Sequence, residues 1–370
     1  MTSLLPSNAG HFETAVEAAH AERWTRMGGA VPFITTAKEN PPPSFLPFLV
    51  WEFGLGMLTP YVDNLYEVID EGVRWHRVRG TYGGVKQGLG FVGVTATLEP
   101  AWHGRAWWNS NQLRMSALPA NDAPLLERIE GITRLSLPFR SDLRRGVYEY
   151  DIDALQGDHN RLDDCHLDVE SGVRLYDGGT VWSFGRTAEI DHTLTEAEGI
   201  AIGNWLDVPE EGGIPWASMT YPWVTATFGW ADNPETQRRE LMAAWFPSRA
   251  IYLMLKDSDE AVIGYRRARA VHAVSAQFGG QYSIDGQTYA PSENGTRVYI
   301  EAMTDFEDAD DVETASVSVV TALTRADGIP VGRLWLRPQD VTAATAFAET
   351  EITLPLRKTV RERIKFLVRF

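Results

Sequence analysis

Cysteine is almost absent from this chain, because Cys165 is the only one among 370 residues. A single cysteine cannot form an intrachain disulfide or supply the several thiolates of a structural zinc site. Long hydrophobic runs are also missing, since no stretch reaches the roughly 18 uninterrupted apolar residues of a transmembrane helix. The opening MTSLLPSNAG lacks the basic and apolar regions of a signal peptide. We therefore expect folding in a reducing compartment, without signal-directed export or a membrane partner.

Positive charge is scarce, because 34 Lys and Arg face 50 Asp and Glu, giving a formal net charge of −16. Such a chain repels phosphate backbones and anionic lipid, so we expect no nucleic-acid partner. Residues 357–370 are the exception, with six basic residues against one glutamate. A basic segment of this kind more often docks on an acidic surface of its own protein or of a partner than on nucleic acid.

Recognisable catalytic patterns are missing as well, including the nucleophile elbow, the zinc-protease helix and the Walker loop. Gly88, Gly90 and Gly93 have the spacing of a dinucleotide-binding loop. That loop requires a strand before its glycines and a helix starting at them, whereas here a predicted helix precedes and a predicted strand follows. We therefore predict a helix end at these glycines and no cofactor.

One segment could hold a metal ion. If DHNRLDDCHLD formed a strand, Asp164, His166 and Asp168 would point the same way and could together bind a hard divalent cation. The alternative is a polar, solvated edge or turn, and no further ligand is identifiable. We predict no catalytic residue and no bound metal, so the chain is not expected to be an enzyme.

Tryptophan is abundant, with 13 residues in the chain, and it is the side chain most enriched at the energetic centres of protein interfaces. A predicted helix after ENPPPS places Leu46, Leu49, Val50 and Phe53 on one side. Its other faces carry further large apolar residues: Phe45, Phe48 and Trp51. A helix that is apolar all round must be covered on all sides, by its own chain or by another. The alternative for these three side chains is an ordinary monomer core.

The order of expected elements indicates an α+β protein in three regions. Residues 1–93 are expected to form a helical region, 94–187 a region of short β-strands, and 188–370 a C-terminal α+β domain. In the first region a helix with the stripe Phe12, Val16, Ala19 and Met27 precedes the helix after ENPPPS. Thr59 with Pro60 is expected to open the next helix, which Gly80 stops, and Thr81 to cap a fourth.

Strands are expected at VTATLEPAW, TRLSLPF, GVYEYDI, GVRLYDGG and VWSFGR. In the last region Thr195 and Glu198 form a possible capping box, and Pro234 opens a second helix. The strand TASVSVVTALTR places Val317, Val319 and Leu323 at even spacing. The final strand, residues 361–370, alternates apolar and basic residues; it pairs inside its own sheet, which we favour, or adds to the sheet of a partner.

Five segments, in order, resemble the tail protein I family of bacteriophages with contractile tails. They are LLPSNA, PPPSFLPFLVWEFGL, VRWHRVRGTYGGVKQGL, YEYDIDAL and DVESGVRLYDGGTVWSFGR, which together span roughly residues 3–187. Arg79 stands where the family usually has lysine, and Phe53-Gly54 interrupts a normally more polar helix end. The resemblance does not extend to residues 188–370.

The resemblance implies a structural subunit of the virion, assembled in the host cytoplasm into a baseplate wedge. One copy would join two J-type baseplate proteins, and six wedges would surround a central hub and hold the base of the tail sheath. We expect residues 188–370 to act as an adaptor for a tail fibre or for the neighbouring wedge. Two alternatives stay open: a glycan-binding tail adhesin, whose tryptophans would line a sugar-binding surface, and a cell-wall hydrolase.

The residues that we expect at protein interfaces are aromatic, with one arginine. For three of them, Trp182, Phe184 and Arg186, the alternative is a strand that packs into the core of the protein itself. The candidates are Phe45, Phe48, Trp51, Trp75, Trp182, Phe184 and Arg186.

Overall fold

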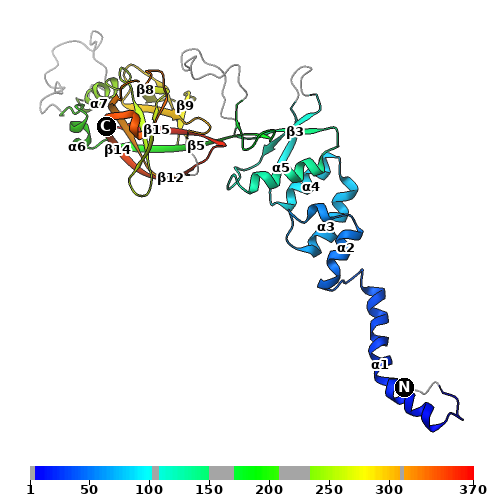
Figure 1. Ribbon diagram of the computed structural model, residues 1–370. Coiled ribbons are helices and arrows are strands. Elements are labelled where there is room, and N and C mark those ends of the chain that lie inside the picture. Colours follow the sequence, from blue (N-terminus) through cyan, green and yellow to red (C-terminus); the bar gives the residue numbers. More distant parts are fainter. Residues whose placement is uncertain (1–4, 102–107, 150–170, 208–233, 309–311) are drawn as a thin grey trace, which may run out of the picture. The chain divides into compact units, whose positions relative to one another are not determined.

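The computed structural model describes residues 5–101, 108–149, 171–207, 234–308 and 312–370 (Figure 1). The chain divides into two compact units, each described here by itself. The helical unit comprises Met1–Leu98 and Ala123–Asp142, and the sheet unit comprises Glu99–Asp122 and Leu143–Phe370. These ranges differ from the three expected from the sequence, because strand β5 (Val181–Thr193) runs through the expected boundary at residue 187. The mixed α+β fold class is confirmed.

The helical unit contains five α-helices among its described residues. They are α1 (His11–Thr36), α2 (Leu46–Glu52), α3 (Leu65–Val78), α4 (Tyr82–Phe91) and α5 (Leu125–Ser136), with 3-10 turns at Pro43–Phe45 and Gly56–Leu58. Helix α3 packs against α2 and α4, and α4 packs against α5. The Thr81 hydroxyl accepts from the Gly84 N–H at the start of α4, so the predicted cap is confirmed.

Two predictions in this unit are wrong. Helix α3 is capped by Asn64, whose side chain accepts from the Tyr66 N–H, and not by Thr59. The Thr59 hydroxyl instead donates to the Gly56 carbonyl and closes the 3-10 turn. The segment TRLSLPF is not a strand, because its first four residues complete α5, which buries Leu126, Ile129 and Ile132 at helical spacing.

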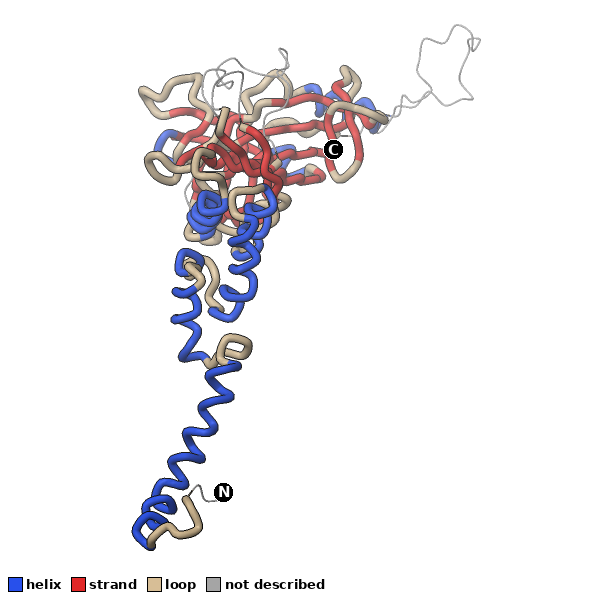
Figure 2. Tube along the Cα trace, turned by 90° about the vertical axis from the view of Figure 1, so that its right-hand side faces the viewer, coloured by secondary structure: helices blue, strands red, loops and turns tan. Residues whose placement is uncertain are grey.

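The sheet unit is built on two sheets, drawn mainly as red tubes in Figure 2. Ten described strands form the larger sheet, in the order β1-β2-β3-β5-β15-β11-β8-β10-β9 with β4 also paired to β5. They are β1 (Ala96–Pro100), β2 (Ser110–Met115), β3 (Asp142–Tyr148), β4 (Val173–Arg174), β5, β8 (Ala270–Ala276), β9 (Tyr282–Ile284), β10 (Gln287–Pro291), β11 (Arg297–Met303) and β15 (Val360–Arg369). In β1 the chain passes from the helical unit to the sheet unit.

The smaller sheet has five described strands in the order β13-β7-β6-β12-β14. They are β6 (Tyr252–Lys256), β7 (Val262–Arg267), β12 (Val312–Arg325), β13 (Trp335–Leu336) and β14 (Val341–Leu356). A shared core joins the two sheets, for example Ile300 and Phe366 of the larger sheet with Leu253 and Val319 of the smaller one. Helix α6 (Glu196–Ala201) packs on β14, and α7 (Pro234–Ala244) packs on β8 and β11.

Strand β12 does not keep one apolar face, as its sequence spacing predicted. Val317 and Val319 belong to the core between the sheets, whereas Leu323 packs against the cluster around Val320 on the opposite face. The cause is an irregularity at Ala322, where the backbone has a φ of 51° and the register with β14 shifts. A β-bulge changes which side chains share a face of the sheet.

The final strand is internal. Strand β15 pairs in parallel with β5 and antiparallel with β11, so both of its main-chain edges are occupied within the sheet. Ile364, Phe366 and Val368 point into the core between the sheets, as their alternation predicted. The alternative in which this strand adds to the sheet of a partner is therefore excluded by its pairing.

Candidate assembly interface

The short helix α2 is defined by the residues at its two ends and is stabilised by packing along one buried side. Pro47 lies in its first turn, where a missing N–H costs nothing, and the chain leaves the helix through Gly54 at a φ of 68°. Leu46, Leu49 and Val50 are buried, and the adjoining Leu55 is fully buried as well. The sequence thus gives α2 one side that packs against its own unit.

The opposite side of α2 is uncovered. Trp51 is 83% exposed and Phe48 is 66% exposed, whereas large aromatic side chains in a closed core are almost fully buried. Phe45 is half-buried, and its ring centroid lies 6.2 Å from that of Phe48. The structure therefore brings Phe45, Phe48 and Trp51 together, and it contradicts the alternative that Phe48 and Trp51 belong to a monomer core.

Beside Trp51 the surface is hollowed into an open, largely apolar depression, and none of its lining residues carries a charge. We call this depression together with Phe45 and Phe48 the α2 face. The sequence analysis did not identify Pro47 and Met57 as part of this face. The turn at Phe53-Gly54 could have indicated them, because it folds the chain back beside the helix. The lining residues are Pro47, Val50, Trp51, Gly54, Gly56, Met57, Thr59 and Leu65.

Trp75 has a different environment from Trp51. It is fully buried inside the helical unit, where its indole N–H donates to the Ser136 hydroxyl over 2.9 Å. Arg79 lies over the ring at 5.4 Å and donates from Nε to the Leu135 carbonyl at the end of α5. The side chain holds α3 against α5, so it does not belong to the exposed α2 face.

Trp182 and Phe184 are buried inside the sheet unit, as the core-strand alternative states. They lie on β5, with 1% and 0% of their surfaces exposed. The Trp182 ring packs on Gly146 of β3, where a Cβ atom would come within 2.3 Å of the ring. Their own chain therefore covers these two side chains.

Arg186 is bound in an internal ion pair. Its guanidinium contacts both carboxylate oxygens of Glu362 at 2.5 and 2.8 Å and donates to the Pro355 carbonyl. Burial raises the pKa of Glu362, and the positive charges of Arg186 and Arg357 oppose that rise. The pair links β5, β15 and the end of β14, and the arginine is not presented at the surface in the manner of an interface anchor.

The basic segment 357–370 docks on acidic residues of its own unit. Each of five basic side chains reaches a carboxylate: Arg357 reaches Asp122, Arg361 reaches Asp305, Arg363 reaches Glu301, Lys365 reaches Glu189, and Arg369 reaches Asp191. The acidic surface that this segment needs is supplied by the chain itself.

Two other candidate sites were identified from the sequence, a glycine-rich turn and a possible metal site. Gly88 and Gly90 lie in the last turns of α4 and Gly93 follows its end with a φ of 70°, so the predicted helix end is confirmed. No cluster of His, Cys, Asp and Glu able to hold a metal ion occurs among the described residues. Asp164, His166 and Asp168 lie outside the described residues. None of the described helices combines the length and the hydropathy needed to cross a membrane.

Comparison with known families finds two matches on separate parts of the chain. Residues 5–131, which include the α2 face, match a phage tail protein family (Tail_P2_I). Residues 257–370 match a baseplate wedge 3 tail fiber network component, so the last third of the chain has a relative that the sequence resemblance did not identify. No curated protein matches the chain. Both families are components of phage tails, and the chain is accordingly a bacteriophage tail and baseplate protein.

Proposed function

We propose that this protein is a structural subunit of a contractile-tail baseplate wedge and that the α2 face binds another baseplate protein. The observation that supports this most directly is the exposure of Trp51 and Phe48 beside an uncharged depression. Large aromatic side chains around a pocket, without charge at the centre, are typical of the energetic core of protein interfaces. The resemblance to tail protein I suggests a J-type baseplate protein as the partner.

The α2 face is large enough to contribute substantially to binding. A buried aromatic side chain removes roughly 150–250 Å² from water, and burial contributes about 25 cal/mol per Å² of apolar surface. Because Trp51 and Phe48 expose 83% and 66% of their surfaces, covering them would contribute roughly 6–9 kcal/mol before the costs of association. Partners that bind elsewhere on the subunit would add to this.

We also propose that the sheet unit connects the wedge to a tail fibre or to the neighbouring wedge. The match to a tail fiber network component covers residues 257–370, which include β15 at the centre of the larger sheet. A rigid two-sheet body suits such an adaptor, because its shared core holds surface positions in fixed relation to one another. Six copies in a baseplate and contact with sheath or hub proteins belong to the same proposal.

Replacing Trp51 by glutamate tests the α2 face. Because Trp51 is exposed in the free chain, Trp51→Glu should fold with nearly unchanged stability. In the assembled wedge the carboxylate would be buried without a partner, at a cost of several kcal/mol. Co-expression with the J-type protein should then give no heteromer, measured by size-exclusion chromatography with light scattering.

Trp51→Phe is the matched control, because it keeps an apolar ring at the same position and should retain assembly. If the Trp51→Glu protein forms the heteromer as the unchanged protein does, the α2 face is not the contact. A folded chain that never binds the J-type protein would overturn the wedge proposal itself.

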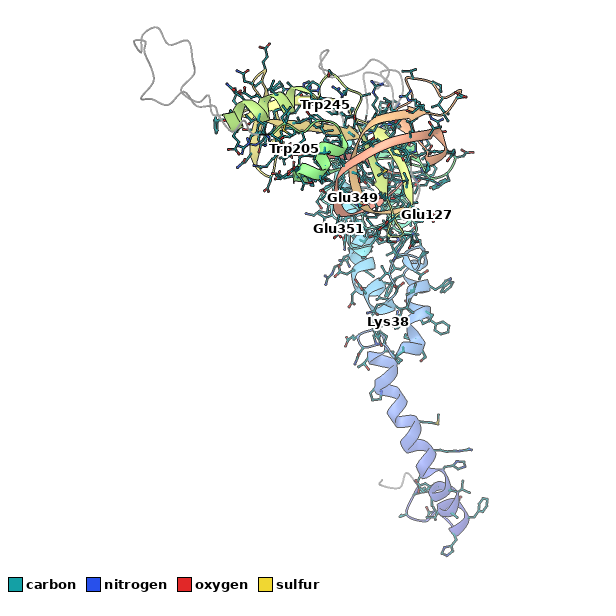
Figure 3. All side chains as sticks on the ribbon, turned by 90° about the vertical axis from the view of Figure 1, so that its left-hand side faces the viewer. Lys38, Glu127, Trp205, Trp245, Glu349 and Glu351 are labelled. Atoms are coloured by element: carbon teal, nitrogen blue, oxygen red, sulfur yellow. The ribbon has the colours of Figure 1, made fainter. Side chains whose placement is uncertain are left out.

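Trp205 and Trp245 do not favour the adhesin alternative, whereas the exposed Trp51 and Trp108 are compatible with it. Trp205 and Trp245, labelled in Figure 3, are half-buried against the core, and an arginine guanidinium lies over each ring, Arg238 at 4.2 Å and Arg249 at 3.8 Å. A sugar stacks on an open ring face, and in each of these rings an arginine covers one face. Binding to a glycan array would favour the adhesin, a clearing zone on a peptidoglycan zymogram the hydrolase, and baseplate genes on either side the wedge.

A further inference from the structure

Strand β14 (Val341–Leu356) is the last strand of the smaller sheet and pairs with β12 on one side only. An edge strand presents unpaired main-chain N–H and C=O groups, and proteins normally cover or blunt such an edge. The two halves of β14 differ in this respect, and they meet at Ala348, where the backbone has a φ of 53°.

The second half of β14 is bonded to its own chain at both ends. The Ala348 N–H donates to the Glu198 carboxylate of α6 over 2.7 Å, and the Pro355 carbonyl accepts from Arg186 over 2.6 Å. Leu354 and Leu356 are buried in the core between the sheets. Main-chain groups at both ends of this half are therefore already bonded within the chain.

The first half, Val341–Ala346, has no such cover. Thr342, Ala343, Ala344 and Ala346 are exposed, and no hydrogen bond joins the outer main-chain edge of this half to another described residue. From Val341 to Ala348 the sequence VTAATAFA contains no charge, proline or glycine. Charged side chains and proline, which often prevent strand addition, are therefore missing where the edge is open.

The chemistry of this edge restricts its occupant. Unpaired N–H and C=O groups along a strand are matched by the main chain of another extended segment, and small side chains let it approach closely. The only charged residues of β14 are Glu349 and Glu351, which follow the open half and are labelled in Figure 3. Glu349 is paired with Lys256, so a second copy of this chain would bring together the Glu351 carboxylates and two net charges of −16. A neutral or basic segment meets no such repulsion.

We propose that Val341–Ala346 is a docking edge that takes an extended, neutral or basic segment of another protein as an added β-strand. The docking edge lies in the sheet unit and does not depend on the α2 face. It would fasten the partner by main-chain hydrogen bonds, which require a strand conformation and few particular side chains.

Hydrogen–deuterium exchange of the full-length protein with a model strand tests this. The probe is an end-capped peptide of alternating threonine and valine that ends in two lysines, and its counterpart ends in two glutamates. The lysine peptide should slow exchange of the outward amides of residues 341–346 at least about tenfold. The glutamate peptide should slow it less.

Ala344→Lys places a charge on the open edge and should abolish the slowing. Ala261→Lys, in the exposed turn between β6 and β7, is the matched control and should behave as the unchanged protein does. Thr342→Lys, also exposed, replaces Ala344→Lys if that variant fails to fold. An absent effect in the unchanged protein, or an equal effect in the edge variants, overturns the docking edge.

Two further results would overturn part of the proposal. Equal slowing by both peptides would contradict the preference for a neutral or basic segment. Protection of residues 341–346 without peptide, rising with protein concentration and lost in Ala344→Lys, would identify a second copy of the chain as the occupant.

Discussion

Two tryptophans of the helical unit, Trp75 and Trp51, have opposite environments, and the residues around each of them decide whether it is buried. Trp75 is fully buried because Gly88 of α4 leaves room for Ser136, which accepts the indole N–H. Trp51 is exposed because α2 turns its other side to the unit. The sequence could predict that both are large apolar residues near helices, but the choice between core and surface depends on contacts with α5, more than 40 residues away.

The pair Gly88 and Gly90 offers a test at the level of single residues. In Gly88→Ala the added Cβ would lie 2.4 Å from the Ser136 hydroxyl and would displace this partner of Trp75. The free energy of unfolding should therefore fall by about 1–3 kcal/mol. In Gly90→Ala, two positions on, no atom lies within 4 Å of the new methyl group. That variant should be stabilised by about 0.5–1 kcal/mol, because alanine favours the helix. Urea unfolding measures both; a Gly88→Ala protein as stable as Gly90→Ala would contradict this packing.

Elements were predictable where a local signal has one structural meaning. Thr81 caps α4, and Thr195 with Glu198 forms the capping box of α6, as the sequence indicated. Elements were missed where two local signals competed. Thr59-Pro60 and Asn64 could each open a helix, and only the 3-10 turn at Gly56–Leu58 decides between them. Which side of α2 is buried depends on its contacts with Leu55 and α3. The spacing of apolar residues within α2 alone does not reveal these contacts.

Strand β15 supports a prediction at the level of elements. Deleting residues 361–370 removes the strand between β5 and β11 and the core side chains Ile364, Phe366 and Val368. The sheet unit should lose its cooperative fold, because each large buried apolar side chain contributes about 2–5 kcal/mol. Limited proteolysis with mass spectrometry should find rapid cleavage throughout residues 234–308. A truncated protein with unchanged protection there would contradict the central position of β15.

At the scale of the whole molecule, charge and apolar surface act in opposite directions. The net charge of −16 keeps free copies apart. The basic segment 357–370 offers little free positive charge to an acidic partner, because at least five of its six basic side chains are paired inside the sheet unit. The exposed α2 face favours association. Before assembly, solubility should therefore depend on how strongly long-range repulsion is screened.

Sedimentation velocity of the free protein at two salt concentrations tests this balance. Raising salt from about 0.01 M to about 0.5 M shortens the Debye length from about 30 Å to a few ångströms, which removes most repulsion between exposed charges. The apolar contribution of Trp51 and Phe48 is not weakened by salt, so monomers should predominate at low salt and oligomers at high salt. Trp51→Glu should stay monomeric at both concentrations, whereas Trp51→Phe should follow the unchanged protein. Association that is independent of salt, or that is equally strong in Trp51→Glu, would mean that another surface holds the copies together.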